Sequence, residues 1–189
     1  SLGVRFCKYV FVSCWTETSD ESIPLWKMYS GDVGGVRISI EHNMFKEYLI
    51  TNLNLDNGLS TQGAIISKIP QQDMENPDFF IQPILDYDND LFYRKIKYVD
   101  GVSEHTREAI KATNLKDGQG DIVIDMKQFG SYKNKRWEFQ NETRFVLYAF
   151  PFNPLREGAN PRISTIVAQS FLSNKPLSFK YYDLVHDKN

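Results

Sequence analysis

The fold is decided by residues 9–42, which read YVFVSCWTETSDESIPLWKMYSGDVGGVRISIEH. Residues 9–14 are mostly β-branched and aromatic with almost no polar relief, which is typical of a strand buried on both faces. Capping residues and a glycine turn follow, and residues 36–40 then alternate apolar and polar side chains as a strand does. The stretch therefore predicts a strand, a turn, a short helix, a glycine turn and a second strand.

The helix of this stretch is expected over residues 19–30, with Ser19 or Asp20 as its cap. Trp26 and Tyr29 are three residues apart and therefore project from one face of the helix. Two large aromatic side chains beside a glycine turn suit the docking of a flat ligand, and they equally suit a filled corner of the core. The sequence leaves both interpretations open.

The composition is that of one ordinary globular domain. The 189 residues are 41% hydrophobic and 24% charged, which is enough to bury a core. A net charge of -2 gives no general attraction to nucleic acid or to an anionic membrane, so neither is expected as a partner. No apolar run approaches the roughly 20 residues that span a bilayer, and nothing resembles a signal peptide, so we expect a cytoplasmic protein. The chain opens in strand-like sequence without an initiator Met, which predicts that an N-terminal segment is missing.

Neither the cysteines nor the acidic residues predict a metal site. Cys7 and Cys14 differ in position by an odd number, which puts them on opposite faces of a strand and predicts free thiols. Three aspartates alternate in the bend at Asp86, Asp88 and Asp90, but the glycine and the closing glutamate of a calcium loop are absent. A solvated hairpin end is the favoured interpretation, and no metal is expected.

The remaining segments predict an α+β fold in a single domain of residues 1–189, with a central, mostly antiparallel β-sheet and a few flanking helices. The 19–30 helix is expected to pack against the sheet. A further helix is predicted over 43–53, and another over 103–115 within a surface helical insertion at 100–121. Strands are predicted over 64–69, 79–85, 91–99, 122–126, 163–171 and 179–185.

A second informative stretch, residues 129–150, reads FGSYKNKRWEFQNETRFVLYAF. Residues 137–150 predict a long strand with one polar face, formed by Glu138, Gln140, Glu142 and Arg144. This face suits an exposed sheet surface with cross-strand ion pairs. It also suits the polar floor of a site in which Arg144 holds Glu142 ionised. Large side chains usually pack, so Trp26 and Trp137 are both expected to be largely buried.

These two stretches resemble the signature regions of a bacterial and phage family catalogued as domain of unknown function 2971. The first pattern falls on Cys14, Trp15, Glu17, Trp26, Tyr29, Gly35, Val36 and Ile38. The second falls on Lys133 or Lys135, Trp137, Glu142 and Arg144. The chain departs from the family at Trp15, where Phe is usual, and at Gln140, where a further Glu is frequent. It also lacks the family's usual opening segment.

By fold analogy alone, the layout of this family resembles that of toxin-type ADP-ribosyltransferases. The resemblance implies NAD as a substrate and Glu142 and Tyr29 as catalytic residues. It also implies that Trp26, Arg144 and Trp15 bind the cofactor. In such chemistry a carboxylate stabilises an oxocarbenium-like centre and an aromatic side chain holds the leaving ring, without a metal. The hypothesis requires Tyr29, Glu142 and Arg144 to line one cleft.

Two classes of function remain, because the sequence contains no nucleophile elbow, P-loop, dinucleotide fingerprint, HExxH or CxxC motif. One is an NAD-consuming transferase or glycohydrolase that acts as a toxin or phage-defence effector. The other is a non-catalytic nucleotide-sensing or protein-interaction module with the same pocket. RNA binding through residues 132–137 is a third interpretation, which the acidic net charge disfavours.

Overall fold

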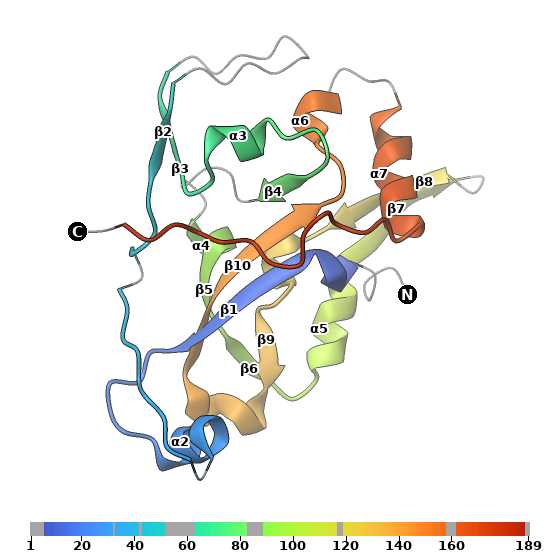
Figure 1. The fold of residues 1–189 in the computed structure, drawn as a ribbon. Helices are drawn as coiled ribbons and strands as arrows, with labels where there is room; N and C mark the ends of the chain where they lie inside the picture. Colours follow the sequence, from blue (N-terminus) through green and yellow to red (C-terminus); the bar gives the residue numbers. More distant parts are fainter. Residues whose placement is uncertain are drawn as a thin grey trace.

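The central sheet is organised around β10 (Glu142–Phe150) (Figure 1). β1 (Val10–Thr16) pairs along one edge of β10. Along the other edge, β5 (Tyr93–Lys95) pairs with the beginning of β10 and β4 (Phe80–Gln82) with its end. All of these pairings are antiparallel, which confirms the predicted α+β class with a central antiparallel sheet.

The structure is a computed structural model that describes residues 6–31, 33–41, 43–51, 63–82, 89–116, 119–157 and 162–187. None of the helices in this part of the chain is both long and apolar enough to cross a lipid bilayer.

Side chains of β10 alternate between two hydrophobic cores, one on each face of the central sheet. One core combines Val146, Tyr148 and Phe150 with Phe6, Tyr9, Phe129 and Phe171. The other combines Phe145, Leu147 and Ala149 with Phe45, Ile81 and Phe92. The strand that is buried on both faces is therefore β10. The same prediction for residues 9–14 is wrong, because β1 is an edge strand on which Val12, Ser13 and Cys14 are exposed.

The opening stretch follows only part of its predicted layout. α2 (Ile23–Ser30) begins later than expected, has Pro24 in its first turn, and ends at Gly31, whose φ of 56° favours glycine. No residue of α2 is buried, and the helix lies beyond the end of the central sheet (Figure 1). The prediction that it packs against the sheet is therefore wrong. Residues 36–40 form no strand, and none of the described strands pairs with them.

The predicted helix over 43–53 is wrong for residues 43–51, and residues 52 and 53 lie outside the described residues. This segment contains β2 (Tyr48–Ile50), which pairs with β3 (Ile65–Ser67) in the predicted 64–69 strand. A helical turn, α3 (Gln71–Met74), then leads into β4. The predicted 91–99 strand is divided between α4 (Asn89–Phe92), β5 and β6 (Lys97–Val99).

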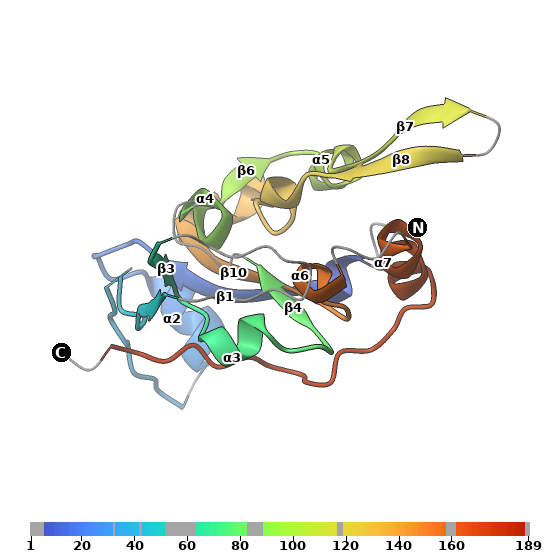
Figure 2. The same cartoon turned by 90° about the horizontal axis from the view of Figure 1, so that it is seen from above.

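The predicted 103–115 helix is half right. α5 (Val102–Glu108) has Gly101 as its N-cap residue, and the chain then forms β7 (Ile110–Lys116). β7 pairs with β8 (Gln119–Ile124) in a hairpin that extends away from the central sheet (Figure 2). The part of the chain predicted as a helical insertion is thus a short helix followed by a β-hairpin.

Neither strand predicted after β10 is formed. The 163–171 strand is replaced by α7 (Ile163–Leu172), which follows the short helix α6 (Pro154–Glu157). Residues 179–185 form no strand; beside them, His186 bridges to Phe45. This C-terminal segment crosses one face of the sheet (Figure 1), where Leu177, Phe179, Tyr182 and Leu184 pack against the second core.

Short 3-10 helices complete the fold: η1 (Cys7–Tyr9), η2 (Met126–Gln128) and η3 (Lys135–Gln140). η3 occupies the first part of the predicted 137–150 strand, and Asn141 with φ 41° separates it from β10. Glu138 therefore does not share a strand face with Glu142. Trp137 is 40% exposed, so the prediction that it is largely buried is wrong.

Candidate functional site

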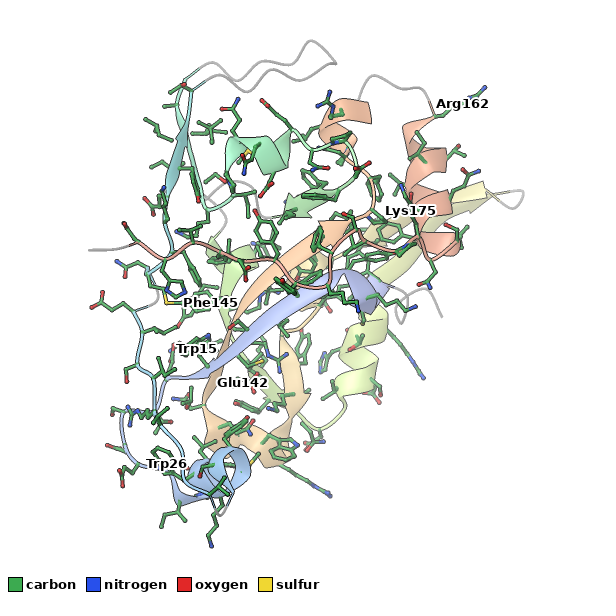
Figure 3. All side chains as sticks on the ribbon, viewed as in Figure 1. Trp15, Trp26, Glu142, Phe145, Arg162 and Lys175 are labelled. Carbon is green, nitrogen blue, oxygen red and sulfur yellow. The ribbon has the colours of Figure 1, made fainter. Side chains whose placement is uncertain are left out.

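A cleft of about 930 Å³ lies between the adjacent ends of β1 and β10 and the segment that carries α2. Its aromatic lining residues are Trp15, Trp26, Tyr29, Tyr93 and Phe145. Its acidic lining residues are Glu17, Asp20, Glu21, Glu41 and Glu142. Figure 3 shows Trp15 and Glu142 near the end of the central sheet, with Trp26 apart from them on α2.

Residues 17–41 form the outer wall of the cleft. Hydrogen bonds connect the two ends of this segment with each other and connect its beginning with the sheet. Arg37 donates from Nη1 to the carbonyl oxygen of Ser19 at 2.9 Å, which ties the two arms of this segment together. Thr16 donates through its hydroxyl to the carbonyl of Gln140 at 2.7 Å, and the amide of Glu17 donates to the carbonyl of Asn141 at 3.0 Å. The wall therefore continues the β1–β10 pairing, and near its end Ile40 packs against the second core.

Glu142 is held from several sides at the first position of β10. Its Oε1 accepts from Nε of Arg144 at 2.6 Å, and its Oε2 accepts from Nζ of Lys133 at 2.5 Å. Its backbone N–H donates to the hydroxyl of Tyr98 at 2.8 Å. Lys133, on β9 (Tyr132–Asn134), also donates to the side chain of Gln140. The Glu142 side chain is only 6% exposed, so its carboxylate is fixed in place.

Opposing effects determine the ionisation of Glu142. Burial by itself raises the pKa of the carboxyl, but the hydrogen bonds from Lys133 and Arg144 and the charge of Arg144 outweigh it. The pKa of Glu142 therefore lies below its ordinary value, and the side chain is a carboxylate at neutral pH.

Cys14 lies opposite Arg144 in the β1–β10 register and lines the cleft. Burial raises the pKa of its thiol, Arg144 opposes this effect, and Glu142 adds to it. The net pKa is raised, so Cys14 stays a thiol at neutral pH and is a poor nucleophile. Cys7 and Cys14 are both free.

Glu17 is another carboxylate of the cleft that is held by partners from the sheet. It was not among the residues predicted for the site. Its Oε1 accepts from the Tyr93 hydroxyl at 2.7 Å and its Oε2 from Nζ of Lys95 at 2.6 Å. Tyr93 and Lys95 come from β5, which is distant from Glu17 in sequence. The signal for Glu17 was its place in the first family pattern, whereas nothing local singled out Tyr93.

The residues predicted for the site are brought together in part. Trp15, Trp26, Tyr29 and Glu142 all line the cleft, but Arg144 does not. The NAD hypothesis required Tyr29, Glu142 and Arg144 to line one cleft, and this requirement is not met for Arg144. Arg144 binds Glu142 and donates from Nη1 to the carbonyl of Gly130 at 2.8 Å, so it holds the Glu142 side chain in place without lining the cleft itself. Tyr29 is 75% exposed and Trp26 is half-buried, so both rings remain accessible from the cleft.

No metal centre accompanies the cleft in the described part of the chain. Within those residues, no group of three His, Cys, Asp or Glu side chains is arranged to hold a metal ion. Asp86 and Asp88 of the acidic bend lie outside them.

Comparisons with protein-family models, curated proteins and solved structures found no match for this chain.

Proposed function

We propose that the protein is an NAD-consuming enzyme that cleaves the bond between nicotinamide and its ribose. The observation that carries the proposal is the ionised, immobilised carboxylate of Glu142 in a cleft lined with accessible aromatic rings. In the reaction the glycosidic C–N bond breaks and its electron pair goes to the ring nitrogen, so neutral nicotinamide leaves. Water or an acceptor side chain then bonds to the ribose carbon and gives up a proton.

The aromatic residues have the task of orienting the leaving ring. Trp26 and Tyr29 come from α2, while Trp15 and Tyr93 come from the sheet, so rings from two separate elements line the cleft. A flat ring gains from stacking on such side chains, and a fixed orientation lowers the entropic part of the barrier. Tyr29 acts in this scheme as a stacking residue for the ring that leaves.

The carboxylates have the task of stabilising positive charge as the bond breaks. Glu142 faces the developing oxocarbenium ion, and it needs no reorganisation because Lys133 and Arg144 hold it. Glu17 accepts the proton of the attacking water or acceptor, since 27% of its side chain is accessible, compared with 6% for Glu142.

The sequence resemblance supports a biological setting for this activity. Side chains from both family signatures line the same cleft: Trp15, Glu17, Trp26 and Tyr29 from the first, and Glu142 from the second. We therefore propose membership in the family of domain of unknown function 2971 and a role as a cytoplasmic toxin or phage-defence effector.

One observation favours a second candidate, the non-catalytic nucleotide-sensing or protein-interaction module. Both oxygens of Glu142 accept from cations, and this neutralises much of the charge that catalysis would use. In that case the cleft binds a nucleotide or a protein segment without turning it over.

The test measures nicotinamide release from NAD by the whole gene product and by its Glu142→Gln and Glu17→Gln variants. Each variant is compared per folded molecule, with Glu138→Gln as the matched control, because Glu138 is an exposed carboxylate on η3 that does not line the cleft. Removing one electrostatic stabiliser should lower the rate about 10²–10³-fold, and Glu138→Gln should leave it unchanged. NAD binding without release supports the module, whereas neither binding nor release refutes both the enzyme and a sensor of NAD.

A further inference from the structure

The lining of the cleft is strongly asymmetric in charge. Five carboxylate side chains line it, whereas Arg37 is the single basic residue among the described lining residues. The Arg37 guanidinium donates to the backbone carbonyls of Ser19 and Thr18, and its single positive charge offsets only one of the five carboxylates. A ligand inside the cleft therefore meets negative potential.

Part of this negative charge has no cationic partner. Glu142 is paired with Lys133 and Arg144, and Glu17 is paired with Lys95. The other three acidic lining residues are Asp20, Glu21 and Glu41. None of them forms an ion pair with another residue that the structure describes. All three are exposed and belong to the outer wall of the cleft.

Aromatic rings are the independent second feature of the same wall. Tyr29 is 75% exposed although it is a large ring, and it lines the cleft together with half-buried Trp26. An accessible aromatic face attracts a cation through its quadrupole, and nearby carboxylates add to this attraction. Neither feature favours a phosphate group, which the carboxylates repel.

From this combination we infer that the cleft selects planar organic cations, of the class of a ring-substituted pyridinium. The inference rests on the proposed function for its physiological ligand, because the nicotinamide ring is a cation in oxidised NAD and is neutral in its reduced form. The ring enters between the aromatic side chains, and the pyrophosphate stays outside the acidic lining. Cleavage of the glycosidic bond then turns the bound cation into neutral nicotinamide, which the cleft holds less tightly and releases.

The experiment compares two probes of nearly equal size by calorimetric titration. One is nicotinamide methylated on its ring nitrogen, which is a cation, and the other is nicotinamide, which is neutral. Wild-type protein should bind the cation about tenfold more tightly, a ratio that corresponds to one well-placed cation–π contact with electrostatic support. Raising the salt concentration should reduce the ratio, because exposed charges are screened.

Variants assign the preference to this wall. The double variant Asp20→Asn/Glu41→Gln should lower the affinity for the cation about tenfold and leave the affinity for the neutral probe unchanged. Glu138→Gln, outside the cleft, should change neither affinity. These carboxylates are exposed and form no ion pair with described residues, so the variants should fold, and their melting temperatures check this.

The outcomes separate this inference from the proposed enzyme. A preference for the cation without NAD consumption supports the inference and refutes the enzyme. NAD consumption with equal affinity for the two probes supports the enzyme and overturns the inference. Binding of neither probe also overturns it, as does a preference that the double variant retains.

Discussion

Glu142 joins segments that are far apart in the sequence. Its carboxylate binds Lys133 from β9 and Arg144 from β10, and its backbone N–H binds Tyr98 from β6. Arg144 extends the network to the loop at Gly130. At the residue scale this cluster therefore has a structural role besides any role in chemistry, since it ties the parallel β6–β9 pair to the central sheet.

Glu142→Gln should consequently destabilise the fold. The amide can still accept from Arg144, but its NH₂ group cannot pair with Lys133, and two partly buried cations lose their counter-charge. Removing one partner of a buried pair costs about 3–5 kcal/mol, and the 23% and 15% exposure of the Lys133 and Arg144 side chains lowers our expectation to about 2 kcal/mol. Urea unfolding at neutral pH measures the loss. An unchanged midpoint would show that the cluster contributes nothing to stability.

The pH dependence of stability follows from the lowered pKa of Glu142. Because its folded-state pKa lies below the ordinary value of 4.5, the unfolded chain takes up the proton first as the pH falls. The stability from this carboxylate is therefore complete above the unfolded-state pKa and is lost as the pH falls through the folded-state pKa. The advantage of wild type over Glu142→Gln should be constant near neutral pH and should shrink below about pH 4.5. Unfolding curves across this range test the prediction, and a gap that widens in acid would contradict it.

At the scale of elements, α2 and β10 differ in what they contribute to the fold. No residue of α2 is buried, whereas Val146 and Tyr148 on β10 are completely buried. The aromatic residues Trp26 and Tyr29 of α2 therefore line the cleft and do not fill a corner of the core, so the core interpretation is wrong, while ligand docking stays a prediction.

Trp26→Ala should accordingly cost less than about 1.5 kcal/mol, because the ring is half-buried and its helix rests on no core. Val146→Ala, in the centre of β10, should cost about 2–3 kcal/mol despite the smaller change in volume. Thermal melting of the two variants compares them directly. If Trp26→Ala were the more damaging, α2 would be part of the folding core, and its ring would not be available to a ligand.

At the scale of the whole molecule, the C-terminal segment covers the second core. Leu177, Phe179, Tyr182 and Leu184 pack on that core. The Tyr9 hydroxyl donates to the carbonyl of Lys175 at 2.7 Å, and the Tyr182 hydroxyl donates to Asp73 at 2.5 Å. The segment has no regular secondary structure of its own, so its position depends on these contacts.

Ending the chain after residue 174 should expose the second core and unfold the protein or make it aggregate. Four apolar side chains lose their burial, each worth about 1.5–3 kcal/mol when complete, and these are only partly buried. Circular dichroism and size-exclusion chromatography of the shortened chain report the result. As a matched control, replacing exposed Tyr181, on the same segment, with Ser should leave the melting temperature nearly unchanged. A shortened chain that melts like wild type would mean that the C-terminal segment contributes nothing to the stability of the fold.

Local sequence pattern by itself determined the α+β class, the strand beginning near residue 10, the strands near residues 65 and 80, and the helix that ends at Gly31. In these places the side-chain period, the Pro24 position and the glycine conformation act within a few residues of the chain. The resemblance to a known family, and not these local signals, implied Trp15, Trp26, Tyr29, Glu142 and Arg144 as residues of one site.

Only the tertiary structure decided which strand is central, since an apolar run such as residues 9–14 does not reveal how many partners will pair with it. It also decided the 3-10 helix before β10. In the sequence, apolar and polar residues alternate from 137 to 140 as in a strand, but in the structure these residues belong to η3, and Asn141 with φ 41° separates η3 from β10. The position of the Glu17 carboxylate is likewise set by tertiary contacts, because it accepts hydrogen bonds from Tyr93 and Lys95 of β5. Contacts between distant segments carry no local pattern, so packing alone brings these groups together.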